Sequence, residues 1–90
     1  MSNPLTPRQV AIEALRANPL VSFTDEQLTG LGTPDFNVSL EELGMDSLAM
    51  MELSIWLEVE CGVEATEEDI REMSSLSGIV DFLERKLRVS

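Results

Sequence analysis

The chain has 90 residues, a hydrophobic content of 43% and a formal net charge of -11, from 17 acidic and 6 basic residues. This length favours a single domain, residues 1–90 with a core at about 7–87, and it leaves little room for a cleft lined by several catalytic side chains. The apolar content argues against disorder, while the charge disfavours nucleic acids and anionic membranes as partners and favours basic proteins.

The first predicted helix runs from Pro7 to Ala17. Thr6 supplies an N-cap, Pro7 suits the first helical position, and Gln9 completes a capping box with Thr6. Asn18 and Pro19 end the run. Apolar residues follow helical spacing within it: Val10, Ala11, Ala14 and Leu15.

The segment from Pro19 to Met45 has no long periodic stretch, although apolar residues are spaced along it. The capping-box pattern occurs there twice and predicts two short helical turns, one at Thr24 with Gln27 and one at Ser39 with Glu42. Gly30, Gly32 and Pro34 are expected to mark the break between them. A connection of this length in a compact domain indicates function, so we expect an anchored, functional loop.

The strongest helix prediction covers Ser47 to Cys61 and ends at Gly62, a suitable left-handed cap. At about 100° per residue, this helix carries two apolar stripes. The inner stripe is Ala49, Leu53, Trp56 and Leu57; the outer stripe is Leu48, Met51, Ile55 and Val59, interleaved with Glu52 and Glu58. Both stripes could be core, but a small domain has few elements to cover both, so we favour a partner for the outer stripe.

Two further helices complete the chain. Thr66 with Asp69 opens a short acidic helix ending near Met73, and Ser75 caps the last helix. The last helix has apolar residues at helical spacing: Leu76, Ile79, Val80, Leu83 and Leu87. No alternating, strand-like pattern competes, so the predicted fold is all-α: a small four-helix bundle with a long loop between its first two main helices and a short third helix.

Ser47 is the most informative residue, because it places a hydroxyl where a loop ends and a helix begins. A helix start has unpaired N–H groups and partial positive charge, so an anion attached to Ser47, such as a phosphodiester, would be stabilised. Asp and Ser are also ordinary N-cap residues, and that alternative stays open at this stage.

Other residue types argue against enzymes and metal sites. The chain has no histidine, which removes the usual general base and the commonest metal ligand. Cys61 is the only cysteine, and we interpret it as a small hydrophobic residue. A chain with a single cysteine cannot form an intramolecular disulfide, which fits a cytoplasmic location. A calcium loop starting at Asp35 fails, because Leu40 stands at its glycine position and Asp46 at its glutamate position, so no metal is expected.

The run Leu43-Gly44-Met45-Asp46-Ser47-Leu48, followed by Met51-Glu52-Leu53, resembles the phosphopantetheine-attachment motif of acyl carrier proteins. The order and spacing of the predicted helices, from about Pro7 to Leu87, are similar to the bundle of that family. The Gly-Met-Asp-Ser-Leu form looks more like carriers of polyketide assembly than carriers of peptide synthetases. Met1 and the ending just beyond the last helix lead us to expect a freestanding carrier.

The resemblance implies a function for several of these residues. Ser47 would receive covalent 4′-phosphopantetheine from coenzyme A through a magnesium-dependent phosphopantetheinyl transferase, with Asp46 helping the transferase to engage. The arm would carry acyl groups as thioesters to loading and condensing enzymes, and the carrier itself would be a monomer without catalytic activity. The family's recognition helix, which docks on basic patches of these partners, maps to Leu48, Met51, Glu52, Ile55 and Glu58.

Three other interpretations remain open. An aminoacyl or peptidyl carrier of nonribosomal peptide biosynthesis would share the fold and differ in cargo. An acidic helical adaptor would bind basic partners and never become modified. A small hydrolase using Ser47 is disfavoured, because no residue could act as its usual base.

Overall fold

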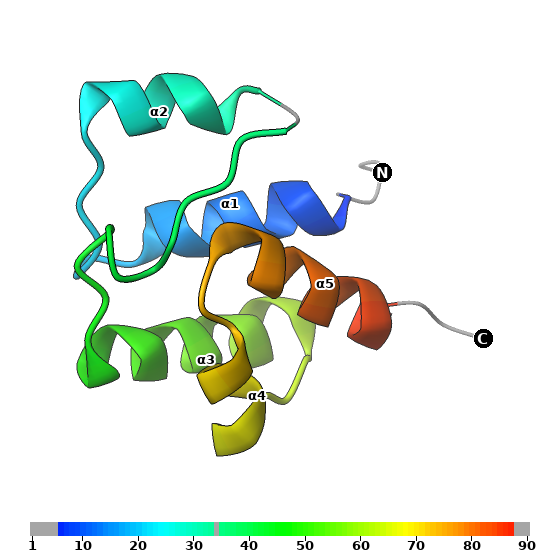
Figure 1. The fold of residues 1–90 in the computed structure, drawn as a ribbon. Helices are drawn as coiled ribbons and strands as arrows, with labels where there is room; N and C mark the ends of the chain where they lie inside the picture. The colour runs from blue at the N-terminus through cyan, green and yellow to red at the C-terminus, as the bar shows by residue number, and fades with distance from the viewer. Residues whose placement is uncertain (1–5, 34, 88–90) are drawn as a thin grey trace.

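The computed structural model describes residues 6–33 and 35–87, and its regular elements there are helices (Figure 1). In chain order these are α1 (Pro7–Ala17), α2 (Asp25–Leu31), α3 (Ser47–Cys61), α4 (Glu67–Glu72) and α5 (Leu76–Leu87). The all-α prediction is confirmed, and the predicted bounds of α1 and α3 are those observed. Within the described ranges, the extended pairing is limited to an isolated bridge between Ser39 and Ser75.

The predicted caps form and determine where the helices begin. At α1, the Gln9 N–H donates to the Thr6 hydroxyl at 3.1 Å and the Thr6 N–H donates to the Gln9 side chain at 2.9 Å. The same reciprocal pair opens α2 at Thr24 and α4 at Thr66. Short polar motifs in the sequence thus satisfy the unpaired N–H groups of three helix starts.

The second predicted turn of the long connection forms its capping bonds without becoming a helix. Ser39 and Glu42 hydrogen-bond to each other through side chain and backbone, but the chain over 40–44 is a turn. At the start of α5, the Ser75 hydroxyl accepts the Gly78 N–H at 3.2 Å, as its predicted cap requires.

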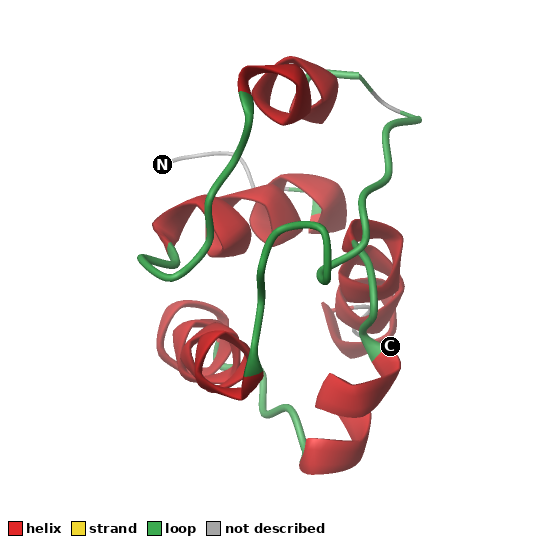
Figure 2. Cartoon of the chain, turned by 60° about the vertical axis from the view of Figure 1, so that its left-hand side comes forward, coloured by secondary structure: helices red, strands yellow, loops and turns green. Residues whose placement is uncertain are grey.

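Three helices supply most of the core, with α1 packed against both α5 and α3. Figures 1 and 2 both place α1 between α2 and α3, so α2 lies outside the main helical contact. The connection contributes anchors as predicted, since Val38, Leu40 and Leu43 are buried. The largest fully buried side chains are Phe82, Leu15, Leu43, Leu53, Leu57, Leu76, Ile79 and Leu83. Val80 is half-buried, and the Leu87 side chain lies outside the described residues.

Polar contacts pin the connection to the helices. The Arg8 guanidinium of α1 donates to the carbonyls of Thr33 and Phe36, each at 2.9 Å. The Asn37 side chain accepts the Ser77 N–H at 2.8 Å, in the first turn of α5. These bonds satisfy backbone groups that the irregular chain leaves unpaired, so the connection is ordered against the bundle.

Gly30 corrects one detail of the sequence prediction. The sequence predicts that it marks, with Gly32 and Pro34, the break between two turns, but Gly30 lies inside α2, which ends at Leu31 and is capped by Gly32. Glycine occupies this position because the chain passes close to Phe36, and a Cβ at Gly30 would overlap the Phe36 ring. Pro34 lies outside the described residues. In the part of the chain that the structure describes, no helix combines the length and apolar content that crossing a bilayer requires.

Candidate functional site

Ser47 is the first residue of α3, and it is exposed. The N-cap is its neighbour Asp46, whose carboxylate Oδ1 accepts the Ala49 N–H at 2.9 Å. The ordinary capping role therefore belongs to Asp46. The Ser47 hydroxyl takes no part in that bond and stands at the positive end of a 15-residue helix.

A tight turn lies directly before the start of α3. Leu43 is 2% exposed and anchors the turn in the core, and the Met45 N–H donates to the Leu40 carbonyl at 3.1 Å. Gly44 has a φ of 74°, in the left-handed region that glycine adopts without steric cost. The motif Leu43-Gly44-Met45-Asp46 thus serves as an apolar anchor, a left-handed corner and a cap in front of Ser47.

The two predicted stripes of α3 differ sharply in exposure. The inner stripe is buried, with Ala49, Leu53 and Leu57 each 0% exposed. Trp56, which was predicted with them, is half-buried against the edge of the core. The outer stripe is open: Leu48 is 57%, Met51 58%, Ile55 47% and Val59 71% exposed. The alternative that both stripes belong to the core is therefore wrong.

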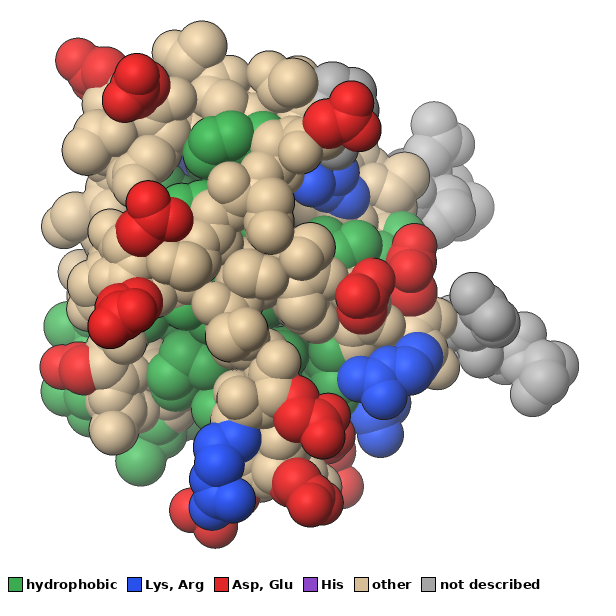
Figure 3. Space-filling model, in the orientation of Figure 1, with side chains coloured by type: hydrophobic (Ala, Val, Ile, Leu, Met, Phe, Trp, Pro, Cys, Tyr) green, Lys and Arg blue, Asp and Glu red, His purple; other side chains and the backbone are tan. Residues whose placement is uncertain are grey.

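The outer stripe is combined with negative charge. Glu52 and Glu58 are exposed on the same helix. Figure 3 shows hydrophobic side chains gathered over the α3 region of the molecule, with acidic side chains beside them. A surface of this kind is complementary to an apolar patch rimmed by Lys or Arg, and charge complementarity of this kind speeds encounter.

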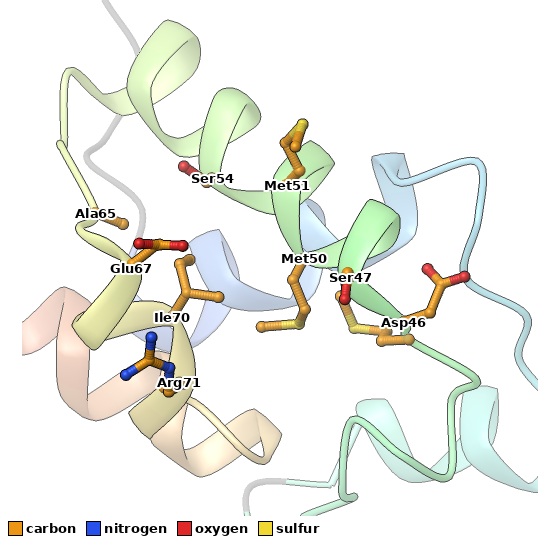
Figure 4. Close-up of a pocket in the computed structure, with 10 residues that line it drawn as sticks. Asp46, Ser47, Met50, Met51, Ser54, Ala65, Glu67, Ile70 and Arg71 are labelled. Carbon is orange, nitrogen blue, oxygen red and sulfur yellow. The ribbon is translucent and has the colours of Figure 1, made fainter.

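A groove of about 690 Å³ opens beside Ser47, between α3 and the segment that carries α4. Figure 4 shows Ser47, Met50 and Ser54 along one wall and Glu67, Ile70 and Arg71 along the other. Its lining is Met45, Asp46, Ser47, Met50, Met51, Ser54, Ala65, Glu67, Ile70 and Arg71. The groove is largely apolar along its length and charged at its edge, so a flexible, partly polar chain attached at Ser47 would fit along it.

The sequence did not predict this groove. Its walls come from segments about 20 residues apart, and the residues of α4 carry no motif that points towards Ser47. The available signal was weak: Met45 and Met50 flank the serine, and methionine is typical of adaptable apolar surfaces.

The Cys61 thiol is no rival to the Ser47 site. Partial burial, together with the neighbouring charge of Glu60, raises the pKa of Cys61 above its ordinary value. The thiol therefore stays protonated at neutral pH and is a poor nucleophile. It also lies at the opposite end of α3, about 21 Å along the axis from Ser47 at 1.5 Å per residue.

The calcium-loop residues have other roles in this structure. The Asn37 side chain accepts the Ser77 N–H, and Ser39 bonds with Glu42. Across residues 6–33 and 35–87, no group of three or more Cys, Asp or Glu side chains is placed to hold a metal ion.

Comparison with known proteins gives an independent view of the same region. A family model described as "Phosphopantetheine attachment site" matches residues 26–83, which include Ser47. An acyl carrier protein from Solidesulfovibrio magneticus is 30% identical over 78 residues, covering 87% of this chain and 80% of that protein.

Two further relatives come from Streptomyces. Anthracycline acyl carrier protein DauA of Streptomyces sp. and anthracycline acyl carrier protein DpsG of Streptomyces peucetius are each 28% identical over 82 residues, covering 91% of this chain and 96% of each relative. No solved structure matches the chain at a comparable level of significance.

Proposed function

This chain belongs to the acyl carrier protein family, and from that premise we propose that Ser47 is the residue that carries its 4′-phosphopantetheine arm. Members of the family are carriers and not enzymes, and they hold this prosthetic group covalently. The terminal thiol of the arm carries acyl groups as thioesters. The proposal concerns which residue holds the arm, what docks beside it and which cargo it receives.

The observation that carries the proposal is the separation of roles between Asp46 and Ser47. The Asp46 carboxylate accepts the capping bond from the Ala49 N–H, so the side chain of the exposed Ser47 remains available for modification. Modification would join Ser47 Oγ to the pantetheine phosphate of coenzyme A and release adenosine 3′,5′-bisphosphate, with the serine proton passing to a base of the transferase. The resulting phosphodiester would be stabilised by the N-terminal end of α3.

The residues around Ser47 fit such a group. The serine is exposed, as a transferase requires, and the adjoining groove of about 690 Å³ offers an apolar surface along Met50 and Ile70. Ser54 and Arg71 add polar groups at the same groove. These features support an arm that is attached at Ser47 and in contact with α3 and α4.

We propose the outer face of α3 as the docking surface for partner enzymes. It consists of Leu48, Met51, Ile55 and Val59 with Glu52 and Glu58, and Asp46 lies at its end beside Ser47. As a family member the chain interacts with a phosphopantetheinyl transferase and biosynthetic enzymes. Exposed ion pairs contribute only about 0–1 kcal/mol each, so docking here would be brief, as repeated delivery to several enzymes requires.

For the cargo, we propose a polyketide-type acyl chain. The support is the pair of Streptomyces relatives whose names specify anthracycline carriers, together with the Gly44-Met45-Asp46-Ser47-Leu48 form of the motif. We propose further that residues 1–90 act as one carrier domain, as their length favours, and that a single cysteine, Cys61, fits a location in the cytoplasm. We also propose that the domain is a monomer.

The decisive experiment is modification in solution. The chain is incubated with coenzyme A, magnesium and a promiscuous phosphopantetheinyl transferase, and its intact mass is measured. We expect the mass of one phosphopantetheine group to be added to the wild type and to Ser54→Ala, which removes a hydroxyl from the same groove, but not to Ser47→Ala. Addition to Ser47→Ala, or none to the wild type, would refute the assignment.

The cargo proposal has its own test. The modified carrier is offered to a malonyl-transferring enzyme of polyketide assembly and, separately, to aminoacyl-adenylating enzymes. Acylation by the first class alone supports the proposal, and aminoacylation alone contradicts it.

A further inference from the structure

Asn18 is the one polar residue that is buried among the described residues, with 6% of its surface exposed. Both polar atoms of its side chain have partners. Its Oδ1 accepts the Leu20 N–H at 3.0 Å, which closes the turn after α1. Its Nδ2 donates to the Ala49 carbonyl at 2.9 Å, which connects the end of α1 to α3 across 31 positions of sequence.

Ala49 lies two residues after Ser47, is 0% exposed, and is held on both sides by side chains. Its N–H is held by Asp46 and its carbonyl by Asn18, each at 2.9 Å. In a regular helix that carbonyl already accepts the N–H four residues later. The Asn18 bond is therefore additional to the helical pattern, and it fixes the first turn of α3 to α1.

We propose that Asn18 is a positioning residue for Ser47: through Ala49 it holds the first turn of α3, so that the serine hydroxyl is presented in one place to the modifying enzyme. This inference rests on the proposed function of Ser47. Helix ends fray, and a frayed first turn would displace Ser47 even while the outer face of α3 remained docked. Because α1 is packed on α5, the Asn18–Ala49 bond ties the first turn of α3, which includes Ser47, to the packed core.

One substitution separates this role from the closure of the α1 turn. Asn18→Asp keeps an oxygen for the Leu20 N–H and nearly the same volume, but it replaces the donor to Ala49 with a carboxylate oxygen facing a carbonyl. Asn18→Ala removes both bonds without adding charge and serves as the second variant. Ile79→Val, buried in α5, is the control that lowers stability and leaves both hydrogen bonds to Ala49 in place.

The test measures the rate of modification by the transferase as a function of carrier concentration, with rates corrected for the folded fraction. The net strength of one hydrogen bond corresponds to a change of about threefold to tenfold. For Asn18→Asp and Asn18→Ala we expect kcat to fall by that factor with KM little changed, because the docking residues remain. Ile79→Val should retain the wild-type kcat.

Amide hydrogen exchange supplies a readout that does not depend on modification. Exchange at Ala49 and Met50, whose N–H groups both donate to Asp46, should accelerate in both Asn18 variants relative to α5, and Ile79→Val should not show this local change. Wild-type kcat and wild-type exchange at these amides in the Asn18 variants would overturn the proposal, as would an equal loss in Ile79→Val. An unmodified wild type would instead refute the role of Ser47, and the exchange data would still decide whether Asn18 holds the turn.

Discussion

The two stripes of α3 have similar composition and opposite environments. Leu53 and Leu57 on the inner stripe are completely buried, whereas Leu48 and Ile55 on the outer stripe are about half exposed. Apolar residues occur singly on most protein surfaces, but four lie on one helix face here, beside carboxylates and the exposed Ser47, and this supports our proposal that the face is an interaction surface. One face of α3 thus packs into the bundle, and the other is the face that we propose for docking.

The difference shows why α3 can be strongly apolar without being buried on every side. The core needs only one face, which contacts α1. The other face is left open because α2 lies beyond α1, and α4 is only six residues long. The fold therefore leaves a hydrophobic surface in place next to Ser47.

The largest expected effect is on stability. Leu53→Ala should lower the free energy of unfolding by about 2–5 kcal/mol, because it leaves a cavity in a fully buried site. Ile55→Ala on the outer stripe should change it by about 0.5 kcal/mol or less, as exposed substitutions do. Urea unfolding followed by circular dichroism measures both, and equal losses would remove the distinction between the two faces.

The rate of modification should instead depend on the outer stripe. Ile55→Ala should lower kcat/KM for the transferase by roughly fivefold to tenfold, mainly through KM, because truncation of a docking residue costs on the order of 1 kcal/mol. Leu28→Ala, an exposed leucine of α2, is the matched control and should leave the rate unchanged. If both variants behave alike, the outer stripe is not where the enzyme docks.

The smallest expected effect concerns charge. Glu52→Lys or Glu58→Lys should slow modification and acyl loading by about threefold at low salt, since exposed charge pairs are weak, and the defect should shrink as salt is raised. Glu84→Lys on α5 makes the same change in net charge away from α3 and should have little effect. Rates measured at several salt concentrations give the comparison, and a defect independent of salt would point to another cause.

The sequence predicted the parts of this structure that local chemistry determines. The caps at Thr6, Thr24 and Thr66, the bounds of α1 and α3, and the left-handed Gly62, with a φ of 66°, all follow from residues close together in the chain. The exposure of the outer stripe required one more step, an argument from the small number of covering elements, and the structure confirms it.

What could not be predicted depends on contacts between distant segments. Asn18 resembled an ordinary helix stop, and its bond to Ala49 exists only once α1 and α3 are packed. Gly30 resembled a breaker until the ring of Phe36 was found against it. The groove has the same origin, because Arg71 and Ile70 reach it only through the placement of α4.

The most direct test of the different roles of the inner and outer stripes of α3 is the binding of the transferase, observed by nuclear magnetic resonance. The isotope-labelled chain is titrated with the enzyme in the absence of coenzyme A, and backbone amide shifts are followed. We expect the largest changes at Ser47 and along the outer stripe, Leu48, Met51, Ile55 and Val59. Changes centred on α2 or α5, with α3 unaffected, would contradict the account.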